Sequence, residues 1–418
     1  MDRFDELNRL GESLNQQKIS RRAFLGKGLA LGFSMAVLAP ILAACGSSSD
    51  TSSSTTTAAS GAPTNKKIRV LGIAVALQDA QLKQFTADTG YEIEPVIDTL
   101  TGMMTKMLTA SDEYDCIENN ATYMAPVWDA GVIAPIPVEK IPNWKDAIPL
   151  FTDPNAPGAK YGWPMSQTYT DDAKTAFKGV PTFFNFEAMG YNQAKIPGGI
   201  DSYAAMYDSK YRNKVAIWND AVWTIGMTAN YLVASGQMPA PATNIGDLST
   251  SEVDTVVAYL TKKKQEGQFR AIWSDYGQSV NLLASQEAWL ADAWNPAFND
   301  AARQSKLPLI YINPKEGNRP WYMSIALSKK AKNPEGVYAF ANWKLGGWYG
   351  AQIAPLGYYS PTTTVKAAME PAAYEMWYGG KGRPAGSYDE RVANVAYWPG
   401  WPQQYEYYLA KWSAFLAS

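Results

Sequence analysis

Histidine is absent from all 418 residues of the chain. Imidazole is the usual general base at neutral pH, a partner in the Ser/His/Asp and Cys/His nucleophilic systems, and the commonest metal ligand in proteins. Its absence excludes the most frequent forms of hydrolytic and metal-dependent catalysis. We therefore expect no catalytic residue, no metal site and no cofactor.

Cysteine is nearly absent, with Cys45 and Cys116 as the two copies. If Cys45 is used elsewhere, as argued below, no disulfide can form within the chain. Iron–sulfur clusters, blue-copper centres and cysteine-based zinc sites also lack their ligands. We expect Cys116 to be a buried small hydrophobic residue and not a reactive thiol.

An excess of charge of one sign is missing too, because 37 basic residues face 39 acidic ones, for a formal net charge of −2. A nucleic-acid-binding protein normally shows a basic excess or stripe, so nucleic acid is not an expected partner. Hydrophobic residues make up 46% of the chain and charged residues 18%, as in globular proteins. At roughly 100–200 residues per domain, the length favours two domains.

The first 45 residues have the features of an export signal. Arg21 and Arg22 precede a modest apolar run, which is typical of twin-arginine export. The run ends in the letters LAAC, whose last residue is Cys45, and this ending resembles the cleavage site of a bacterial lipoprotein. We expect residues 1–45 to be a signal segment, with Cys45 becoming the lipidated first residue of the mature chain.

The alternative is an uncleaved membrane helix that contains a cysteine by chance. However, a membrane span needs about 20 apolar residues, and the length of this run is marginal for that. Residues 46–66 are dominated by Ser, Thr, Ala and Gly, a composition that predicts a flexible tether. The mature protein is therefore expected in the periplasm or at the outer face of the cell membrane, held by its lipid anchor.

After the tether, short apolar runs alternate with segments of helical periodicity. Strands are expected at residues 67–73, 91–96, 114–117, 215–217 and 309–312. Helices are expected at residues 79–89, 103–108, 253–264 and 334–343, with Gly90 as the C-cap of the first. The Pro-rich residues 135–162 indicate a long connection. The alternation predicts an α/β fold with helices on both faces of its sheets.

Several segments of this region, taken in order, carry a family resemblance. They are QFTADTGYEIEP (84–95), SDEYDCIENNATYMAPVWDAGVIAPI (111–136), MGYNQAKI (189–196), SYAAMYDSKYRNKVAIWNDAVWTIGM (202–227), WN (294–295), PKEGNRPWYMSIALSKKAKNPEGVYAFANW (314–343) and LGYYSPTTT (356–364). Their order and spacing resemble the spermidine/putrescine-binding group of bacterial ABC-transporter solute-binding proteins, over most of residues 67–418.

The resemblance implies a two-lobed periplasmic-binding-protein-like fold of type II, with a ligand cleft between lobes joined by crossover strands. Lobe 1 would comprise residues 67–190 and 322–366, and lobe 2 residues 191–321 and 367–418. The implied function is that of a monomeric extracytoplasmic binding protein. It would deliver a small amine-type or polyamine-like solute to an ABC permease and ATPase complex, without enzymatic activity.

The resemblance also places four residues at the ligand. Trp321 and Trp294 would form ring walls, whose faces attract cations. Asp220 would pair with an amine of the solute, although its position before a helical run also suits an N-cap. Tyr358 would lie in the pocket, in a Gly-Tyr turn near the hinge.

Asn120 and Thr122 follow the Tyr-Asp strand, where the family supplies polar contacts; capping of the loop is an equal alternative. Trp223 and Met323 stand where the polyamine binders of the family have carboxylates. An ammonium that enters a closed cleft needs compensating partners, because an unpaired buried charge is costly. The missing acids therefore favour a single cationic or quaternary amine, or an aromatic or amphiphilic solute, over spermidine or putrescine.

Other functions stay open at this point. An exported glycoside-processing enzyme could work with two carboxylates and no histidine. An iron-binding protein of the same fold is suggested by the adjacent Tyr358 and Tyr359, and a sugar-binding protein by the many Trp and Tyr rings. An adhesion or signalling lipoprotein without a permease is a further alternative.

Overall fold

The structure is a computed structural model that describes residues 66–159, 163–241, 244–383 and 385–418. The predicted export signal with Arg21, Arg22 and Cys45, and nearly all of the predicted tether, lie outside the described residues. Among the helices that are described, none has both the length and the apolar character needed to cross a membrane.

The first sheet is mixed and has the strand order β2-β1-β3-β13-β4, with β7 also paired to β13. Strands β1, β2 and β3 are parallel, and β13 is antiparallel to β3, β4 and β7. Its strands are Lys67–Gly72 (β1), Glu92–Ile97 (β2), Cys116–Asn120 (β3), Ile133–Ala134 (β4), Val180–Glu187 (β7) and Arg319–Ser328 (β13). The predicted strands near residues 67–73, 91–96 and 114–117 are confirmed, with ends shifted by up to three residues.

Helices cover both faces of this sheet, as predicted. Phe85 and Phe340 meet at 5.2 Å on one face, whereas Met103 and Met107 pack with Ile117 on the other. The covering helices are Asp79–Thr89 (α4), Leu100–Ala110 (α5), Ala125–Asp129 (α6) and Pro334–Lys344 (α13). Helix α4 has the predicted bounds and ends at Gly90, whose φ of 74° is left-handed, because a residue without a Cβ adopts this conformation at low cost.

A buried ion pair ties this sheet to its helices. The ammonium of Lys344 in α13 lies 2.7 Å from the carboxylate of Glu118 in β3, and neither side chain is exposed. Lys344 also donates to the carbonyl oxygen of Ala76 and to the hydroxyl of Tyr349. Burial lowers the pKa of Lys344, and the neighbouring Glu118 opposes that change.

The second sheet is also mixed, in the order β10-β9-β11-β8-β12. Strands β9, β10 and β11 are parallel, whereas β8 runs antiparallel to β11 and β12. Its strands are Gly190–Asn192 (β8), Val215–Trp218 (β9), Phe269–Trp273 (β10), Leu290–Ala291 (β11) and Leu309–Tyr311 (β12). The predicted strands at residues 215–217 and 309–312 are confirmed within one residue.

Successive residues of β9 face two different helix layers. Val215 and Ile217 join the apolar cluster of α9, α10 and α18, and Ala216 and Trp218 join the cluster that contains α11 and α12, as the alternation of side chains in a strand requires. The helices of this part are Ala204–Tyr207 (α8), Ala221–Ala234 (α9), Thr250–Gln265 (α10), Tyr276–Ala284 (α11), Asn295–Ser305 (α12) and Tyr405–Ala417 (α18).

The Pro-rich connection at residues 135–162 contains short 3-10 turns and one strand of a small antiparallel pair. That pair is Ile136–Pro137 (β5) and Ala176–Phe177 (β6); the remaining helices are Trp163–Thr168 (α7), Gly347–Ile353 (α14), Val365–Ala368 (α15), Pro371–Trp377 (α16) and Tyr388–Ala393 (α17). Cys116 is fully buried, so the prediction of a buried cysteine is confirmed, and burial raises the pKa of its thiol well above the usual range.

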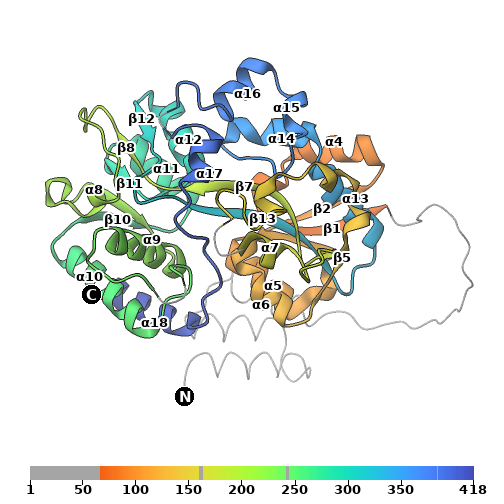
Figure 1. Cartoon of the computed structure of the whole chain (residues 1–418), viewed down its shortest axis with the longest axis horizontal. Helices are drawn as coiled ribbons and strands as arrows, with labels where there is room; N and C mark the ends of the chain where they lie inside the picture. Colours follow the sequence, from red (N-terminus) through yellow and green to blue (C-terminus); the bar gives the residue numbers. More distant parts are fainter. Residues whose placement is uncertain (1–65, 160–162, 242–243, 384) are drawn as a thin grey trace, which may run out of the picture. The chain divides into compact units, whose positions relative to one another are not determined.

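The chain passes between the two sheets at the end of β7 and again just before β13, two long strands that pair with each other. Strand β7 ends at Glu187 and β8 begins at Gly190, while β12 ends at Tyr311 and β13 begins at Arg319. In Figure 1, β7 and β13 lie side by side between the two groups of elements. Each sheet with its helices forms one lobe, and the protein has the predicted two-lobed α/β fold of type II.

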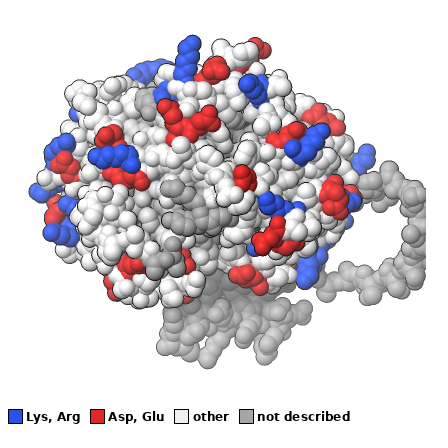
Figure 2. All heavy atoms as spheres, in the orientation of Figure 1, with Lys and Arg blue, Asp and Glu red and all other residues white. Residues whose placement is uncertain are grey.

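The charge distribution agrees with the near balance of acidic and basic residues. On the face drawn in Figure 2, cationic and anionic side chains of the described residues are interspersed. This pattern suits a protein that recognises a small molecule better than one that binds a polyanion.

Candidate functional site

Strands β7 and β13 present one row of alternating side chains toward the second sheet. Their antiparallel register pairs Arg319 with Glu187, Trp321 with Asn185, and Met323 with Phe183. Because side chains alternate along a strand and cross-strand partners share a face, these six residues lie on the same face. All six are buried. This row forms the floor of the candidate site.

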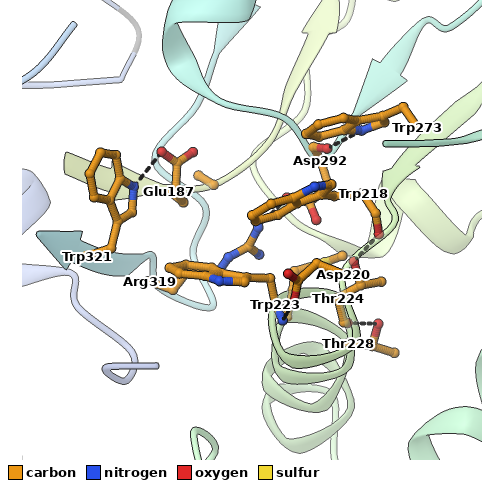
Figure 3. Close-up of polar contacts among 12 residues, drawn as sticks. Glu187, Trp218, Asp220, Trp223, Thr224, Thr228, Trp273, Asp292, Arg319 and Trp321 are labelled. Atoms are coloured by element: carbon orange, nitrogen blue, oxygen red, sulfur yellow. Dashed lines mark hydrogen bonds and ion pairs between the residues drawn. The ribbon is translucent and has the colours of Figure 1, made fainter. Parts of the chain in front are cut away.

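Glu187 connects this row with the second sheet. Its carboxyl group accepts hydrogen bonds from the indole nitrogen of Trp321 at 2.7 Å and from the hydroxyl of Tyr311 at 2.8 Å. Burial raises the pKa of Glu187 to about 7, although the Trp321 donor and the nearby Arg319 counteract part of that effect. The same contacts fix the orientation of the Trp321 ring (Figure 3).

Trp321 has aromatic neighbours that complete one wall of the site. Tyr358 meets it edge-on at 5.8 Å between ring centroids, and Phe183 does so at 6.0 Å. Tyr358 lies 5.1 Å from Phe183 and is partly exposed. The structure therefore brings the predicted residues Trp321 and Tyr358 together.

The second sheet contributes residues from the carboxyl ends of its parallel strands. Strand β9 ends at Trp218, β10 ends at Trp273, and Trp294 follows shortly after β11. The carboxyl ends of parallel strands lie at one edge of a sheet, which is where open α/β sheets bind ligands. The geometry of the strands thus explains why three indoles gather here.

These indoles form a packed cluster. Trp218 and Trp273 are stacked at 5.6 Å, and Trp294 meets them edge-on at 4.9 and 5.1 Å. The phenol ring of Tyr276 stacks on Trp294 at 6.0 Å. Trp294 is partly exposed, whereas Trp273 is fully buried. Trp294, predicted to form a wall of the site, can therefore contact a solute, and Trp273 packs behind it.

Asp220 is the N-cap of α9, the alternative role considered for it. One carboxylate oxygen accepts from the backbone nitrogens of Val222 at 2.9 Å and Trp223 at 3.0 Å. The other oxygen accepts from the hydroxyl of Tyr123 at 2.8 Å. Burial raises the pKa of Asp220, and these hydrogen bonds oppose the effect. Because Tyr123 follows β3, the last contact joins the two lobes.

Asn120 and Thr122 both take part in loop contacts. The side chain of Asn120 accepts from the backbone nitrogen of Thr122 at 3.0 Å and so caps the 3-10 turn Ala121–Tyr123. The hydroxyl of Thr122 donates to the carbonyl oxygen of Pro399 at 3.1 Å. Asn120 also pairs with Met323 across β3 and β13, which places it beside the floor of the site.

Trp223 and Arg319 bring the two lobes into contact at the centre of the site. The guanidinium carbon of Arg319 lies 5.6 Å from the centre of the Trp223 ring. Arg319 also forms an ion pair with Asp292, which follows β11; the Arg319 side chain is 3% exposed and that of Asp292 1%. Burial raises the pKa of Asp292 and Arg319 counteracts it. In Figure 3, Arg319 lies between Trp321 and Trp218, with Trp223 beside it and Asp292 near Trp273.

The adjacent tyrosines do not converge on one point. Tyr358 packs against Phe183, whereas Tyr359 packs against Phe184 at 5.6 Å. Phe183 and Phe184 are neighbours in β7 and face opposite sides of the sheet. Two phenolates that share one metal ion would have to meet on the same side, so this arrangement does not favour iron.

The sequence prediction missed several residues of the site, and they share one property. Each stands in or directly after a strand whose partner is distant in the chain: Glu187, Trp218, Trp273, Asp292 and Arg319. The signal that could have identified Arg319 is its position two residues before Trp321 in an apolar run. This spacing puts both side chains on one face of a strand.

Comparison with known proteins gives one matching family model. The model describes the bacterial extracellular solute-binding protein and matches residues 80–377, more than half of the chain. Among curated proteins, the spermidine/putrescine-binding periplasmic protein of Salmonella typhimurium is 27% identical over 296 residues, which cover 69% of this chain and 76% of the relative.

Solved structures agree at the level of the fold. A spermidine/putrescine ABC transporter substrate-binding protein from Streptococcus pneumoniae is 16% identical and superposes with a TM-score of 0.63, covering 84% of this chain and 97% of its own. A lipoprotein of Treponema pallidum is 14% identical, with a TM-score of 0.64, and the match covers 84% of this chain and 99% of the other.

Proposed function

Because the chain belongs to the bacterial extracellular solute-binding protein family, we propose that it captures a small amine-type solute between its lobes and delivers it to an ABC importer. The first lobe offers Trp321 and Tyr358, and the second offers Trp294 and Asp220. The single observation that carries the proposal is this meeting of aromatic rings and a carboxylate from both sheets. Rings attract cations with their faces, and carboxylates pair with ammonium groups.

The site contains more acid than the sequence predicted. Trp223 and Met323 replace two family carboxylates, but Glu187 pairs with Arg319 in the strand register and Asp292 forms an ion pair with it. Arg319 pairs with Asp292, so it offsets one of these negative charges. The curated relatives are named for spermidine and putrescine; the charge balance here supports an amine solute with fewer cationic groups.

The mechanism needs no chemistry on the solute. In the open form each lobe holds part of the site, and a solute that touches both lobes favours the closed form by its higher affinity for it. The closed form then docks on the permease of an ABC importer. For the lobes we propose residues 67–190 with 322–366 and residues 191–321 with 367–418. The sheets support this division except at its edges, because β13 places residues 319–321 in the first sheet and β8 places Gly190 in the second.

Export and anchoring belong to the same proposal. The paired Arg21 and Arg22 and the LAAC ending support export followed by lipidation of Cys45, with residues 46–66 as the tether. The protein would then work as a monomer at the outer side of the cell membrane. Mass spectrometry of the mature N-terminus would test this, with an unmodified Cys45 as the contradicting result.

A thermal-shift screen followed by isothermal titration tests the function. We expect monoamines, quaternary amines or related cations to raise the unfolding temperature, and sugars to leave it unchanged. Mass spectrometry should recover the bound solute unaltered. Stabilisation by sugars alone, or conversion of the solute, would contradict the proposal.

A further inference from the structure

Buried side-chain nitrogens without a hydrogen-bond partner gather on the floor of the site. Among the described residues they include Nε and Nη1 of Arg319 and Nδ2 of Asn185. Arg319 is 3% exposed and Asn185 is fully buried. In the register of β7 and β13, Asn185 pairs with Trp321 and Glu187 pairs with Arg319. These pairs are two residues apart, so the side chains of Asn185 and Arg319 lie on the same face of the sheet.

All of these orphan groups are N–H donors. Buried polar groups in proteins are paired in the great majority of cases, and those left over call for a ligand or a bound water. An ammonium group cannot pair with them, since it also carries only donors, and a buried guanidinium repels it. A second amine is therefore the wrong partner for this part of the site.

A carboxylate has the matching chemistry. Its two oxygens accept from the adjacent N–H groups of one guanidinium, and this fork geometry makes the contact strong and directional. The terminal Nη2 of Arg319 already donates one N–H to Asp292. The N–H groups on Nε and Nη1 have no acceptor and lie at opposite edges of the guanidinium, so a carboxylate can accept from one of them together with the second N–H of Nη2. Nδ2 of Asn185 offers a further donor from the paired strand.

The neighbouring acids leave two nitrogens of Arg319 without an acceptor. The oxygens of Glu187 accept from Trp321 and Tyr311 instead of Arg319, and its pKa of about 7 means that it is partly protonated at neutral pH. Asp292 has one oxygen, Oδ2, without a partner. The centre of the site therefore offers unused guanidinium N–H donors beside one unused carboxylate acceptor.

We infer that the solute carries a carboxylate as well as an amine, and that Arg319, assisted by Asn185, binds this carboxylate. The preferred class is thus a small zwitterionic amino acid, held with its amine toward the carboxylates and aromatic rings and its carboxylate toward Arg319. This inference rests on the proposed function, since it specifies the amine-type solute. It also makes Arg319 a specificity-determining residue that separates amino acids from diamines.

The test uses straight-chain ω-amino acids of two to six carbons, each compared with the diamine and the monoamine of equal length by isothermal titration. We expect one or more amino acids to bind at least 10-fold more tightly than both matched amines. Arg319→Lys keeps a positive charge for Asp292 but removes the fork, and should weaken that amino acid at least 10-fold more than its matched monoamine.

Two further variants separate recognition from folding. Asn185→Asp places a carboxylate beside the proposed carboxylate position and should weaken amino acids more than monoamines. Arg383→Lys is the control, because Arg383 is partly buried and packs on Trp377 in α16, a helix that contributes no residue to the site. It should leave the preference for amino acids intact.

The titrations distinguish failure of this inference from failure of the proposed function. If a diamine or monoamine binds as tightly as its matched amino acid, this inference fails and the proposed function stands. If neither amines nor amino acids bind, both fail. If Arg319→Lys and Asn185→Asp keep the full preference for amino acids, Arg319 is not the carboxylate receptor and the inference is overturned.

Discussion

The Trp321 indole is held on two sides, by its hydrogen bond to Glu187 and by its contacts with Phe183 and Tyr358. A ring fixed in this way loses little entropy when a solute packs on it. Trp321→Ala should therefore weaken solute binding by about 10- to 100-fold, as for buried aromatic anchors in general. Isothermal titration measures the effect.

The matched control is Trp348→Ala, since Trp348 is exposed and packs on Trp343 in the outer part of the first lobe. It should leave affinity unchanged. Equal affinity in the Trp321 variant and the wild type would remove Trp321 from the site.

Glu187 makes stability depend on pH. Its folded-state pKa of about 7 lies above the ordinary glutamate pKa of 4.5, so the folded protein binds this proton more tightly than the unfolded chain does. The resulting stabilisation is complete below pH 4.5 and is lost as the pH rises through 7. Relative to Glu187→Gln, the free energy of unfolding of the wild type should fall by roughly 3 kcal/mol between pH 4.5 and 8.

Urea unfolding at several pH values checks this expectation. Glu370→Gln, at an exposed glutamate, should follow the wild type across the whole range. A constant difference between wild type and Glu187→Gln would show that Glu187 keeps an ordinary pKa in the folded protein.

The limits of sequence reasoning are clear at this scale. Trp321 and Tyr358 lie together as predicted, and Asp220 and Asn120 take the capping alternatives that were considered for them. Arg319 and Glu187 could not be paired from sequence, because 132 positions separate them and only the strand register of β7 and β13 brings them together. Register depends on tertiary packing, which a local pattern does not contain.

At the scale of elements, Asp220 serves both helix α9 and the proposed ligand. Asn caps a helix as well as Asp does, so Asp220→Asn should preserve the free energy of unfolding within about 0.5 kcal/mol. The loss of the charge should nevertheless weaken amine binding by about 10-fold, corresponding to a charge-assisted contact. Chemical denaturation and titration on the same sample measure the two effects.

Helix α11 offers the control. Asp275 caps it by accepting from the backbone nitrogen of Gln278 at 2.9 Å, and Asp275 is exposed. Asp275→Asn should change neither stability nor affinity. Full amine affinity in Asp220→Asn would mean that Asp220 is a cap alone.

The buried pair of Glu118 and Lys344 joins β3, α13 and the loop at Ala76. Removing one partner leaves the other charge buried and uncompensated, so Lys344→Met should destabilise the protein by about 3–5 kcal/mol. Adding Glu118→Gln to that variant should restore part of the loss. Urea denaturation provides the measurement.

An exposed pair serves for comparison. Lys140 lies 3.1 Å from Glu335 at the surface, and such pairs contribute little. Lys140→Met should therefore leave the free energy of unfolding nearly unchanged. A similar small effect for Lys344→Met would contradict the importance of the buried pair.

Secondary structure was most predictable where one face of an element is solvated. The bounds of α4 follow from its helical periodicity and from Gly90, and the predicted helix at residues 334–343 agrees with α13 to within one residue. Strands β7 and β13 were missed because every residue in them is buried. A strand covered on both faces has no alternation of polar and apolar residues to detect.

At the scale of the whole molecule, binding and stability are linked. A solute that binds only the folded state adds RT ln(1 + [L]/Kd), which is about 2.7 kcal/mol at 100 times Kd. If the solute closes the lobes, its addition should also reduce the radius of gyration in X-ray scattering. Stabilisation without compaction would mean that one lobe alone binds the solute.

The hydrogen bond from Tyr123 to Asp220 spans the two lobes without any help from a guest. It favours closure of the lobes in the solute-free protein. The closed solute-free protein then presents the same outer surface as the solute-bound one. They would occupy the importer unproductively, so transport should slow when binding protein greatly outnumbers its cargo. Removal of the hydrogen bond between Tyr123 and Asp220 should lower the affinity for the solute. It should also reduce the fraction of time for which solute-free binding protein occupies the importer.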